Sequence, residues 1–550
     1  MKRLINRQYI GPITAHPDIA TATARQTAAR YLAPLLMALL SFLTVFNSLP
    51  AAAAGFNGGN NSAVSTTTKH SDTRNPDNEF KLPELGDSSA GLMPPAQEQA
   101  LGQAWLRSFR ASVPLESDPL LFEYMENLLL RLASYSDLED KSLDLVVVKN
   151  PNINAFAVPG GVVGVNTGLV LYAETEAQLA SVLSHELAHL SQRHFSRSVE
   201  ASKRASFASV AGLLAGIALA VASEGDAAQA AIITSQAAVL DSQLRYSRLH
   251  EREADRLGMR TLVQAGYPAE AAANMFKQML NASRLYGNRV PEFLLTHPVT
   301  ESRISDASNR ARQLPAQAAM LSMDYQLVKT RVKVLSESSS KDSIKHFRLA
   351  LSQFENPESG SPKNNSAEQQ LNKDAARYGL ALAYNRNRDT RKARETLVPL
   401  LHQVPGKIAY TLLDIEIDIE SGKHKQAERR LRDLNALIPN NYAIAMLLAE
   451  TLLTNKEYVS AQKVLSDLSK SRPKQADIWY MLAETHGLAG DILKLHQARA
   501  EFFLLRGNFS QARQHLKQAL NLSRDNYQNI ARIKQRVRDI NTLQRITENL

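Results

Sequence analysis

Residues 184–190 read SHELAHL and contain the pattern His-Glu-x-x-His at His185, Glu186 and His189. Positions i and i+4 share one face of a helix, so both imidazoles can converge on a single metal ion. Glu186 follows the first imidazole, where its carboxylate can take a proton from a metal-bound water. Two neutral imidazoles, a third ligand from elsewhere and an open position for water are typical of a zinc hydrolase.

The residues around this pattern predict a helix. Neither Gly nor Pro interrupts residues 174–193, and apolar side chains recur there at helical spacing. The apolar stripe consists of Leu179, Val182, Leu183, Leu187 and Leu190. We therefore expect a helix with a buried face over this stretch.

A third ligand is offered by residues 249–258, which read LHEREADRLG. Glu251 and Asp255 share a helix face, so one can bind the metal while the other hydrogen-bonds the far nitrogen of a ligating His. Glu253 is the rival ligand, but it would point to another side of the helix. Taken alone, Glu-x-x-x-Asp is more often a solvated helix face. Beside His-Glu-x-x-His, the metal site is favoured.

Four motifs together resemble peptidase family M48, the gluzincin metallopeptidases, and they occur in the family's order over residues 95–312. They are NPNINAFAVPGGVVGVNTGLV (150–170), HELAHLSQRH (185–194), EREAD (251–255) and THPVTESRI (296–304). The resemblance implies one Zn²⁺ per chain, held by His185, His189 and Glu251, with Glu186 as the general base. The His of the Thr-His-Pro motif, here His297, also approaches the metal in this family.

Other roles around the metal stay open. His297 is a structural residue, an oxyanion donor or a movable fourth ligand. As a fourth ligand it would exclude water and keep the enzyme inactive until its loop moved. Asp255 and Arg303 are expected to support the metal ligands or to stabilise the transition state, and His194 is expected to be structural. The candidates for the donor that stabilises the oxyanion are His297, Arg303, Arg252 and Tyr246.

The length and composition of the chain exclude several other kinds of site and of protein. A chain of 550 residues is too long for a single core. It has no Cys, which removes disulfides, thiolate metal ligands and lipid attachment at a Cys. Its formal net charge of +10 is too mild, without a basic motif, to indicate nucleic-acid binding. Any zinc site here must therefore use His and carboxylate.

The N-terminal region is typical of a secretory signal. An apolar run of 15 residues, 32–46, follows Arg25 and Arg30 and precedes NSLPAAAAG, which offers an Ala-x-Ala cleavage site. The run is shorter than the ~20 residues that cross a membrane comfortably. We expect a signal peptide over residues 1–54, with an uncleaved anchor as the alternative. A disordered tether rich in Asn, Ser, Thr and Gly is expected at 55–92.

The expected fold class is α+β and mostly helical, with the zinc-peptidase domain over residues 93–312 and a helical solenoid behind it. Helices are expected at 96–111 and 118–134, a strand at 143–149 and a hairpin at 155–170. In gluzincins an edge strand pairs with the substrate backbone. Residues 161–165 are our candidate for it, and an interior strand is the alternative.

Residues 207–222 are apolar on every side and too few to cross a membrane. They predict part of a buried helical hairpin. The alternatives are a lid over the cleft, or a patch that makes peripheral contact with a membrane or a partner.

A 34-residue period begins at Asp374. Its columns are Ala393, Ala427 and Ala461; Leu397, Leu431 and Leu465; and Pro405, Pro439 and Pro473. These columns match the tetratricopeptide repeat, so residues 374–550 should form an α-solenoid. Leu495 occupies the next small position. We therefore expect the phase to slip by half a repeat, with helices at 498–505 and 511–522. The linker at 313–373 is expected to contain helical segments, with one helix at 343–354 inside the Ser-, Lys- and Asn-rich stretch 336–372.

The resemblance and the signal together imply a periplasmic zinc endopeptidase in outer-membrane protein quality control and assembly, with chaperone-like activity. The implied substrates are misfolded or stalled outer-membrane proteins. The implied partner of the repeats is the outer-membrane β-barrel assembly machinery. One alternative is a chaperone or scaffold with latent or minor proteolysis, and another is that the repeats only pack against the peptidase domain. The intact ligands and Glu186 favour the enzyme, because a pseudo-enzyme would be expected to lose one of them.

Overall fold

The computed structural model describes residues 93–201, 237–285, 292–317, 321–355, 367–524 and 526–548, all within the unit Ser88–Leu550. The expected signal peptide (1–54), the tether (55–92) and the apolar segment 207–222 lie outside the described residues. Within the described ranges, no helix combines the length and the apolar character needed to cross a membrane.

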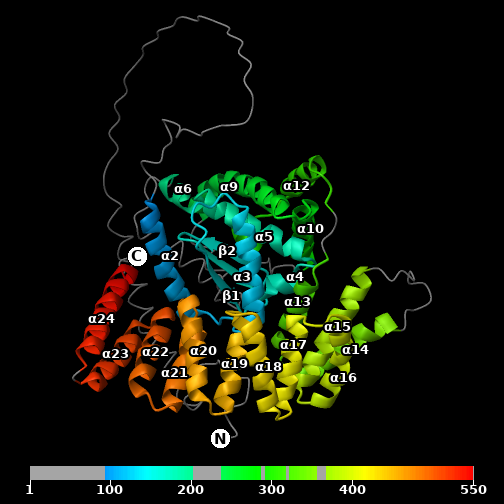
Figure 1. Cartoon of the computed structure of the whole chain (residues 1–550). Helices are drawn as coiled ribbons and strands as arrows, with labels where there is room; N and C mark the ends of the chain where they lie inside the picture. Colours follow the sequence, from blue (N-terminus) through cyan, green and yellow to red (C-terminus); the bar gives the residue numbers. More distant parts are fainter. Residues whose placement is uncertain are drawn as a thin grey trace, which may run out of the picture. The chain divides into compact units, whose positions relative to one another are not determined.

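The first part of the chain places two helices beside a small sheet (Figure 1). Helix α2 (Pro95–Ser112) and helix α3 (Pro119–Ser134) confirm the two helices predicted here. Each begins with a Pro in its first turn, where the missing N–H leaves no hydrogen bond unmade. Asp118 caps α3 by accepting a hydrogen bond from the Leu121 N–H at 3.0 Å.

The sheet has three strands in the order β1-β3-β2. Strand β1 (Asp144–Val148) pairs in parallel with β3 (Val162–Asn166), and β2 (Ala155–Val158) pairs with β3 in the antiparallel sense. The prediction that residues 161–165 form the edge strand is therefore wrong. Because β1 pairs with its far side, β3 is interior and fully buried, and within the described ranges β2 is an edge strand that pairs with β3 alone.

The predicted hairpin is also shorter than expected. Its second strand ends at Asn166, and helix α4 (Thr167–Tyr172) takes up the rest of the segment. The change follows from a close approach that Gly168 permits. A Cβ on Gly168 would lie 2.1 Å from the Pro151 carbonyl oxygen, so only Gly lets the chain turn away from the sheet there.

The next two long helices pack on each other, and the first of them also contacts strand β2. Helix α5 (Glu176–Ser191) confirms the helix predicted around the His-Glu-x-x-His pattern, and Thr175 caps its first turn. Helix α9 (Ala237–Gln264) packs along it. Gly258 permits the close approach, because a Cβ there would lie 3.0 Å from the backbone of His185. The remaining helices of this part are α6 (His194–Ala201), α10 (Glu270–Leu285), α11 (Glu292–Thr296) and α12 (Glu301–Gln313).

The segment expected to be a linker contains helix α13 (Met323–Ser336) and helix α14 (Ser340–Glu355), and α14 covers the helix expected at 343–354. Helix α13 connects the two parts of the chain and also contributes side chains to the hydrophobic core of the peptidase part. Its Tyr325 is fully buried, and the phenol O–H lies 3.0 Å from the carbonyl oxygen of Val170 and 2.6 Å from that of Ala173. The structure therefore contains the helical segments expected in this stretch.

Paired helices follow and stand side by side in Figure 1. The pairs are α15 (Ala367–Arg386) and α16 (Thr390–Gln403), α17 (Ile408–Glu420) and α18 (His424–Leu437), α19 (Tyr442–Thr454) and α20 (Tyr458–Ser471), α21 (Ala476–Leu488) and α22 (Ile492–Leu505), and α23 (Phe509–Ser523) and α24 (Tyr527–Glu548). The Ala and Leu columns of the period are confirmed as the contacts between neighbouring helices, since every one of those side chains is buried.

The predicted half-repeat slip is wrong. Helix α22 begins at residue 492 and α20 at residue 458, so the 34-residue period continues. Leu495 fits because the small residue has moved to the facing helix. A Cβ on Gly487 of α21 would lie 2.7 Å from the Leu495 Cδ1. The two helices have exchanged a small and a large side chain at one contact.

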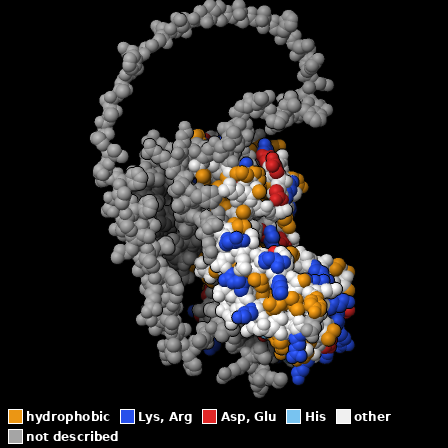
Figure 2. Space-filling model, turned by 90° about the vertical axis from the view of Figure 1, so that its left-hand side faces the viewer, with side chains coloured by type: hydrophobic (Ala, Val, Ile, Leu, Met, Phe, Trp, Pro, Cys, Tyr) orange, Lys and Arg blue, Asp and Glu red, His pale blue; other side chains and the backbone are white. Residues whose placement is uncertain are grey.

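The repeats pack against the peptidase part. Arg331 of α13 lies between Asp118, at 2.8 Å, and Glu416 of α17, at 3.1 Å. Glu123 of α3 accepts a hydrogen bond from the backbone N–H of Tyr442, the first residue of α19, at 3.1 Å. One expected alternative, packing of the repeats against the peptidase domain, is thus present in the structure. The side of Figure 1 on which α2 and α24 lie shows more Lys and Arg than Asp and Glu (Figure 2).

Candidate metal centre

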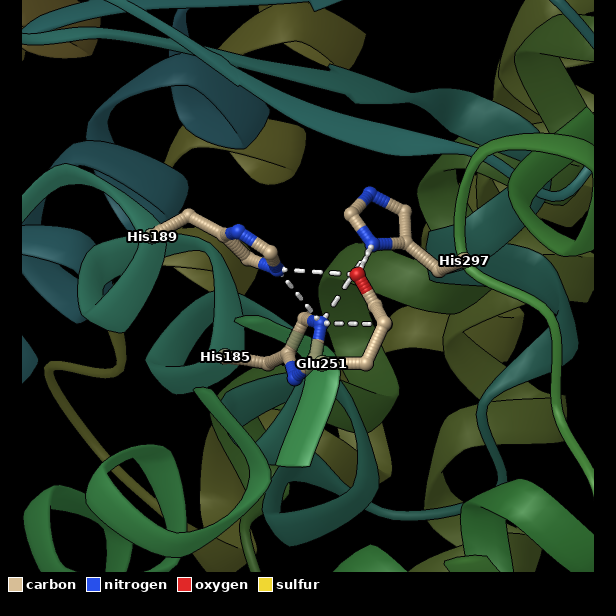
Figure 3. A group of neighbouring side chains, drawn as sticks. All are labelled: His185, His189, Glu251 and His297. Carbon is tan, nitrogen blue, oxygen red and sulfur yellow. Dashed lines mark hydrogen bonds and ion pairs between the residues drawn. The ribbon is translucent and has the colours of Figure 1, made fainter. Parts of the chain in front are cut away.

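Four side chains from three segments meet at one point (Figure 3). His185 and His189 come from α5, Glu251 comes from α9, and His297 follows α11 directly. Their ligand atoms all lie within 4.8 Å of one another. The structure therefore brings together all the residues that sequence reasoning placed on the metal.

The separations between these atoms fit a tetrahedral ion. His185 Nε2 lies 3.0 Å from His189 Nε2 and 3.4 Å from His297 Nδ1. Glu251 places one oxygen 3.3 Å from His189 Nε2 and 2.9 Å from His297 Nδ1, and its other oxygen 3.4 Å from His185 Nε2. Zinc bonds of ~2.0–2.1 Å in a tetrahedron would hold the ligand atoms about 3.3 Å apart. The donor set of three imidazoles and one carboxylate is also one that zinc accepts.

The ligands lie inside the protein, with side-chain exposures of 4% for His185, 5% for Glu251, 12% for His297 and 15% for His189. Burial alone would raise the pKa of Glu251. The neighbouring His297 ring and the hydrogen bonds from the imidazoles instead hold that pKa well below its usual range. A carboxylate that stays ionised while buried is ready to bind a cation.

The two imidazoles of α5 titrate in opposite directions. Burial alone would lower the pKa of His185, but hydrogen bonds to Asp255 and Glu251 outweigh it and raise that pKa to about 10. Burial dominates at His189 and lowers its pKa to about 4. Without a metal, His185 is therefore protonated at neutral pH.

Asp255 and Arg303 support the ligands from behind. Asp255 Oδ1 lies 3.1 Å from His185 Nδ1, the nitrogen that faces away from the metal position. The guanidinium of Arg303 donates two hydrogen bonds of 2.7 Å to Asp255, reaches Glu251 at 2.9 Å and donates to the Pro298 carbonyl at 2.8 Å. With its donors engaged in this way, we assign Arg303 to positioning the ligands rather than to the oxyanion.

The other candidates for the oxyanion donor fare differently. The side chain of Arg252 is exposed, on the side of α9 that faces away from the ligands. The side chain of Tyr246 is not among those that the structure describes. Glu186 is buried next to the ligands, and its Oε1 lies 3.6 Å from His297 Nε2. Glu186 and His297 thus face the same small space beside the metal position.

Glu253 does not reach the metal position and contacts His194 instead, with 3.1 Å between its Oε2 and His194 Nε2. His194 in turn places Nδ1 2.9 Å from Nδ1 of His189. Sequence reasoning excluded Glu253 as a ligand but missed this connection. No spacing rule could have found it, because it depends on the turn that ends α5.

Comparison with known proteins adds independent information. Residues 119–311 match the sequence profile of peptidase family M48, and residues 418–485 match a tetratricopeptide repeat. The chain is 34% identical over 359 residues to the β-barrel assembly-enhancing protease of Escherichia coli, which covers 65% of this chain and 70% of that protein.

Two further relatives have similar names or functions. A putative β-barrel assembly-enhancing protease of Vibrio cholerae is 35% identical over 331 residues, or 60% of this chain and 65% of that protein. The mitochondrial metalloendopeptidase OMA1 of Schizosaccharomyces pombe is 31% identical over 181 residues, or 33% of this chain and 50% of that protein.

Proposed function

This chain belongs to peptidase family M48, in the group of β-barrel assembly-enhancing proteases, and we propose that it is a periplasmic zinc endopeptidase that acts on outer-membrane proteins during their assembly. That it is a metalloendopeptidase follows from the family. The choice of zinc rests on one observation, the four buried ligand atoms at tetrahedral separations. The periplasmic location rests on the signal-like N-terminal sequence, and on relatives named for β-barrel assembly.

Zinc bound at this site would supply a Lewis acid and a water whose pKa is lowered to about 7. Glu186 would be the group that accepts a proton from this water and returns it to the leaving amine, because the described carboxylates of Glu251, Asp255 and Glu253 are held by His and Arg side chains. Asp255 and Arg303 keep His185 and Glu251 in place throughout. The outer edge of β2 offers backbone donors and acceptors that align a peptide beside α5.

His297 makes the resting enzyme latent in this proposal. Its Nδ1 fills the fourth corner of the ligand set, which is where water must bind. The residue lies just after the short helix α11, next to Pro298, and outside the two helices α5 and α9 that carry the other three ligands. A substrate or partner that draws this stretch away would open the site.

The repeats provide the second half of the proposal. They hold the peptidase part through α3 and leave other surfaces for partners. We assign to those surfaces the recruitment of misfolded or stalled outer-membrane proteins, and docking to the β-barrel assembly machinery. The relatives' names support this choice. Chaperone-like activity would follow if a client binds the repeats without entering the site.

The proposal divides the chain into a signal peptide (1–54), a tether (55–92), the peptidase domain (93–312), a connection with helices α13 and α14 (313–373) and the repeats (374–550). The alternative is a scaffold on the assembly machinery with minor proteolysis. Casein cleavage by the purified chain, abolished by a chelator and restored by Zn²⁺, separates the two. Cleavage that survives complete metal removal would contradict the proposal.

A further inference from the structure

The two metal-binding imidazoles of α5 are supported in different ways. Asp255 contacts the outer nitrogen of His185 directly, at 3.1 Å. The outer nitrogen of His189 contacts a second imidazole, that of His194, at 2.9 Å, and Glu253 stands behind His194 at 3.1 Å. We propose that His194 and Glu253 are positioning residues for the metal, which act by fixing the tautomer and the orientation of His189. The inference rests on the proposed zinc site.

The chemistry of the groups determines where the protons lie. An ionised carboxylate can only accept a hydrogen bond, so the N–H of His194 is on Nε2, facing Glu253. In a neutral imidazole the other nitrogen is then an acceptor, and it faces His189. His189 must donate from Nδ1, which leaves the lone pair of its Nε2 pointing at the metal position. A single chain of donors thus runs from His189 to Glu253.

An indirect connection is needed because of the spacing on α9. Glu253 is two residues from Glu251, so the two carboxylates point to different sides of the helix. Arg197 of α6 holds the Glu253 carboxylate at 2.9 Å. His194 spans the remaining gap to His189, and its ring stacks on His250 with centroids 4.2 Å apart. The imidazole of His194 is therefore held on two sides.

The turn that presents His194 is strained. Arg193 has φ of 51°, in the left-handed region that a residue with a Cβ rarely adopts. Its side chain keeps the turn in place, with Nε 3.0 Å and Nη2 2.8 Å from Glu98 Oε1. Such strain persists only where the surroundings enforce it, and it is concentrated at functional sites. Here it turns His194 back towards a residue five positions earlier.

The test is zinc affinity, measured by competition with a chromophoric chelator on the full chain. His194→Phe keeps a ring that can stack on His250 but cannot accept from His189, and its Kd for zinc should rise about 10- to 100-fold. His194→Asn keeps an acceptor near the position of Nδ1 and should recover most of the affinity. Arg260→Ala is the matched control, because Arg260 lies on the same helix as Glu253 but pairs with the exposed Asp137, and its Kd should change less than about threefold.

A second readout separates positioning from folding. The Nδ1–H proton of His189 in the zinc-loaded protein should give a downfield NMR signal that His194→Phe moves upfield and Arg260→Ala leaves in place. Should His194→Phe fail to fold, Glu253→Ala provides the same comparison. Wild-type affinity in His194→Phe would overturn the inference and leave the zinc site standing. A wild-type chain that binds no zinc would instead overturn the proposed function.

Discussion

At the scale of single residues, the proton on His185 links metal binding to pH. The carboxylates of Asp255 and Glu251 raise the pKa of His185 to about 10 against the burial that lowers it. Zinc needs the neutral imidazole, so binding at pH 7 must release about one proton per site. Calorimetry in buffers of different ionisation enthalpy measures that number. Zinc affinity should rise with pH up to about 10, and affinity that is flat between pH 7 and 9 would refute the assignment.

The same pKa has the opposite effect on the metal-free protein. A His whose folded pKa is raised stabilises the fold fully below its unfolded pKa, about 6.5. That stabilisation is lost as pH rises through the folded value of about 10. The Tm of the metal-free chain should therefore fall between pH 7 and 10, whereas the zinc-loaded chain, in which His185 is already neutral, should change less.

His297 tests whether the resting site is closed. His297→Ala opens the fourth corner of the ligand set, so basal cleavage of an unstructured substrate should rise while zinc binds slightly less tightly. Cleavage rates and zinc content measured on the same samples decide the matter. A fall in activity of about 100-fold with zinc retained would make His297 an oxyanion donor instead.

The sequence predicts the position of a single residue where the periodicity of its own helix determines it. The spacing of His185 and His189, and of Glu251 and Asp255, follows from helix periodicity alone, and the structure places these side chains as expected. The choice between the two roles expected for Arg303, support of the ligands or stabilisation of the transition state, does not follow from the sequence, and neither does the contact of His194 with His189. Each depends on which residues of other helices face it, and no periodicity in its own segment reports that.

At the scale of elements, the packing of α2 on the turn between β2 and β3 is tight enough to test. A Cβ on Gly102 would lie 1.8 Å from the carbonyl oxygen of Pro159. Gly102→Ala must therefore push α2 away from the turn and should lower the free energy of unfolding by about 1–3 kcal/mol. Casein cleavage should fall too, because the turn anchors the edge strand β2.

Gly487→Ala is the matched control for that substitution. The added Cβ would meet only the Leu495 Cδ1, at 2.7 Å, at the end of a side chain that can rotate. Urea unfolding of both variants should show a clear loss for Gly102→Ala and little change for Gly487→Ala. Equal stabilities would mean that α2 is not held by this contact.

Two errors at this scale have physical causes. The strand at 161–165 has the composition of an edge or an interior strand alike, and only the long-range pairing with β1 decides between them. Leu495 alone suggests a change of phase, because a large residue stands where the earlier repeats have Ala. The small residue that makes room for Leu495 is Gly487, on the facing helix. A comparison of one repeat position at a time cannot show that two facing positions have exchanged their sizes.

At the scale of the whole molecule, one ion-pair network joins the peptidase part to the repeats. Arg331 is 7% exposed and lies between Asp118 and Glu416. Arg331→Met would leave both carboxylates buried without their cation, which should lower the free energy of unfolding by about 3–5 kcal/mol. Lys407→Met is the control, since Lys407 pairs with Asp324, which is 63% exposed, and should cost at most about 1 kcal/mol. Similar losses in the two variants would show that the network does not join the two parts.

The central claim is that His185, His189 and Glu251 hold zinc while Glu186 moves the proton. The most direct test measures zinc content and casein cleavage in wild type and Glu186→Gln, side by side. The substitution removes the base but no ligand, so both chains should carry one zinc, and turnover should fall by about two orders of magnitude or more. Equal turnover in the two chains, with zinc present in both, would contradict the claim.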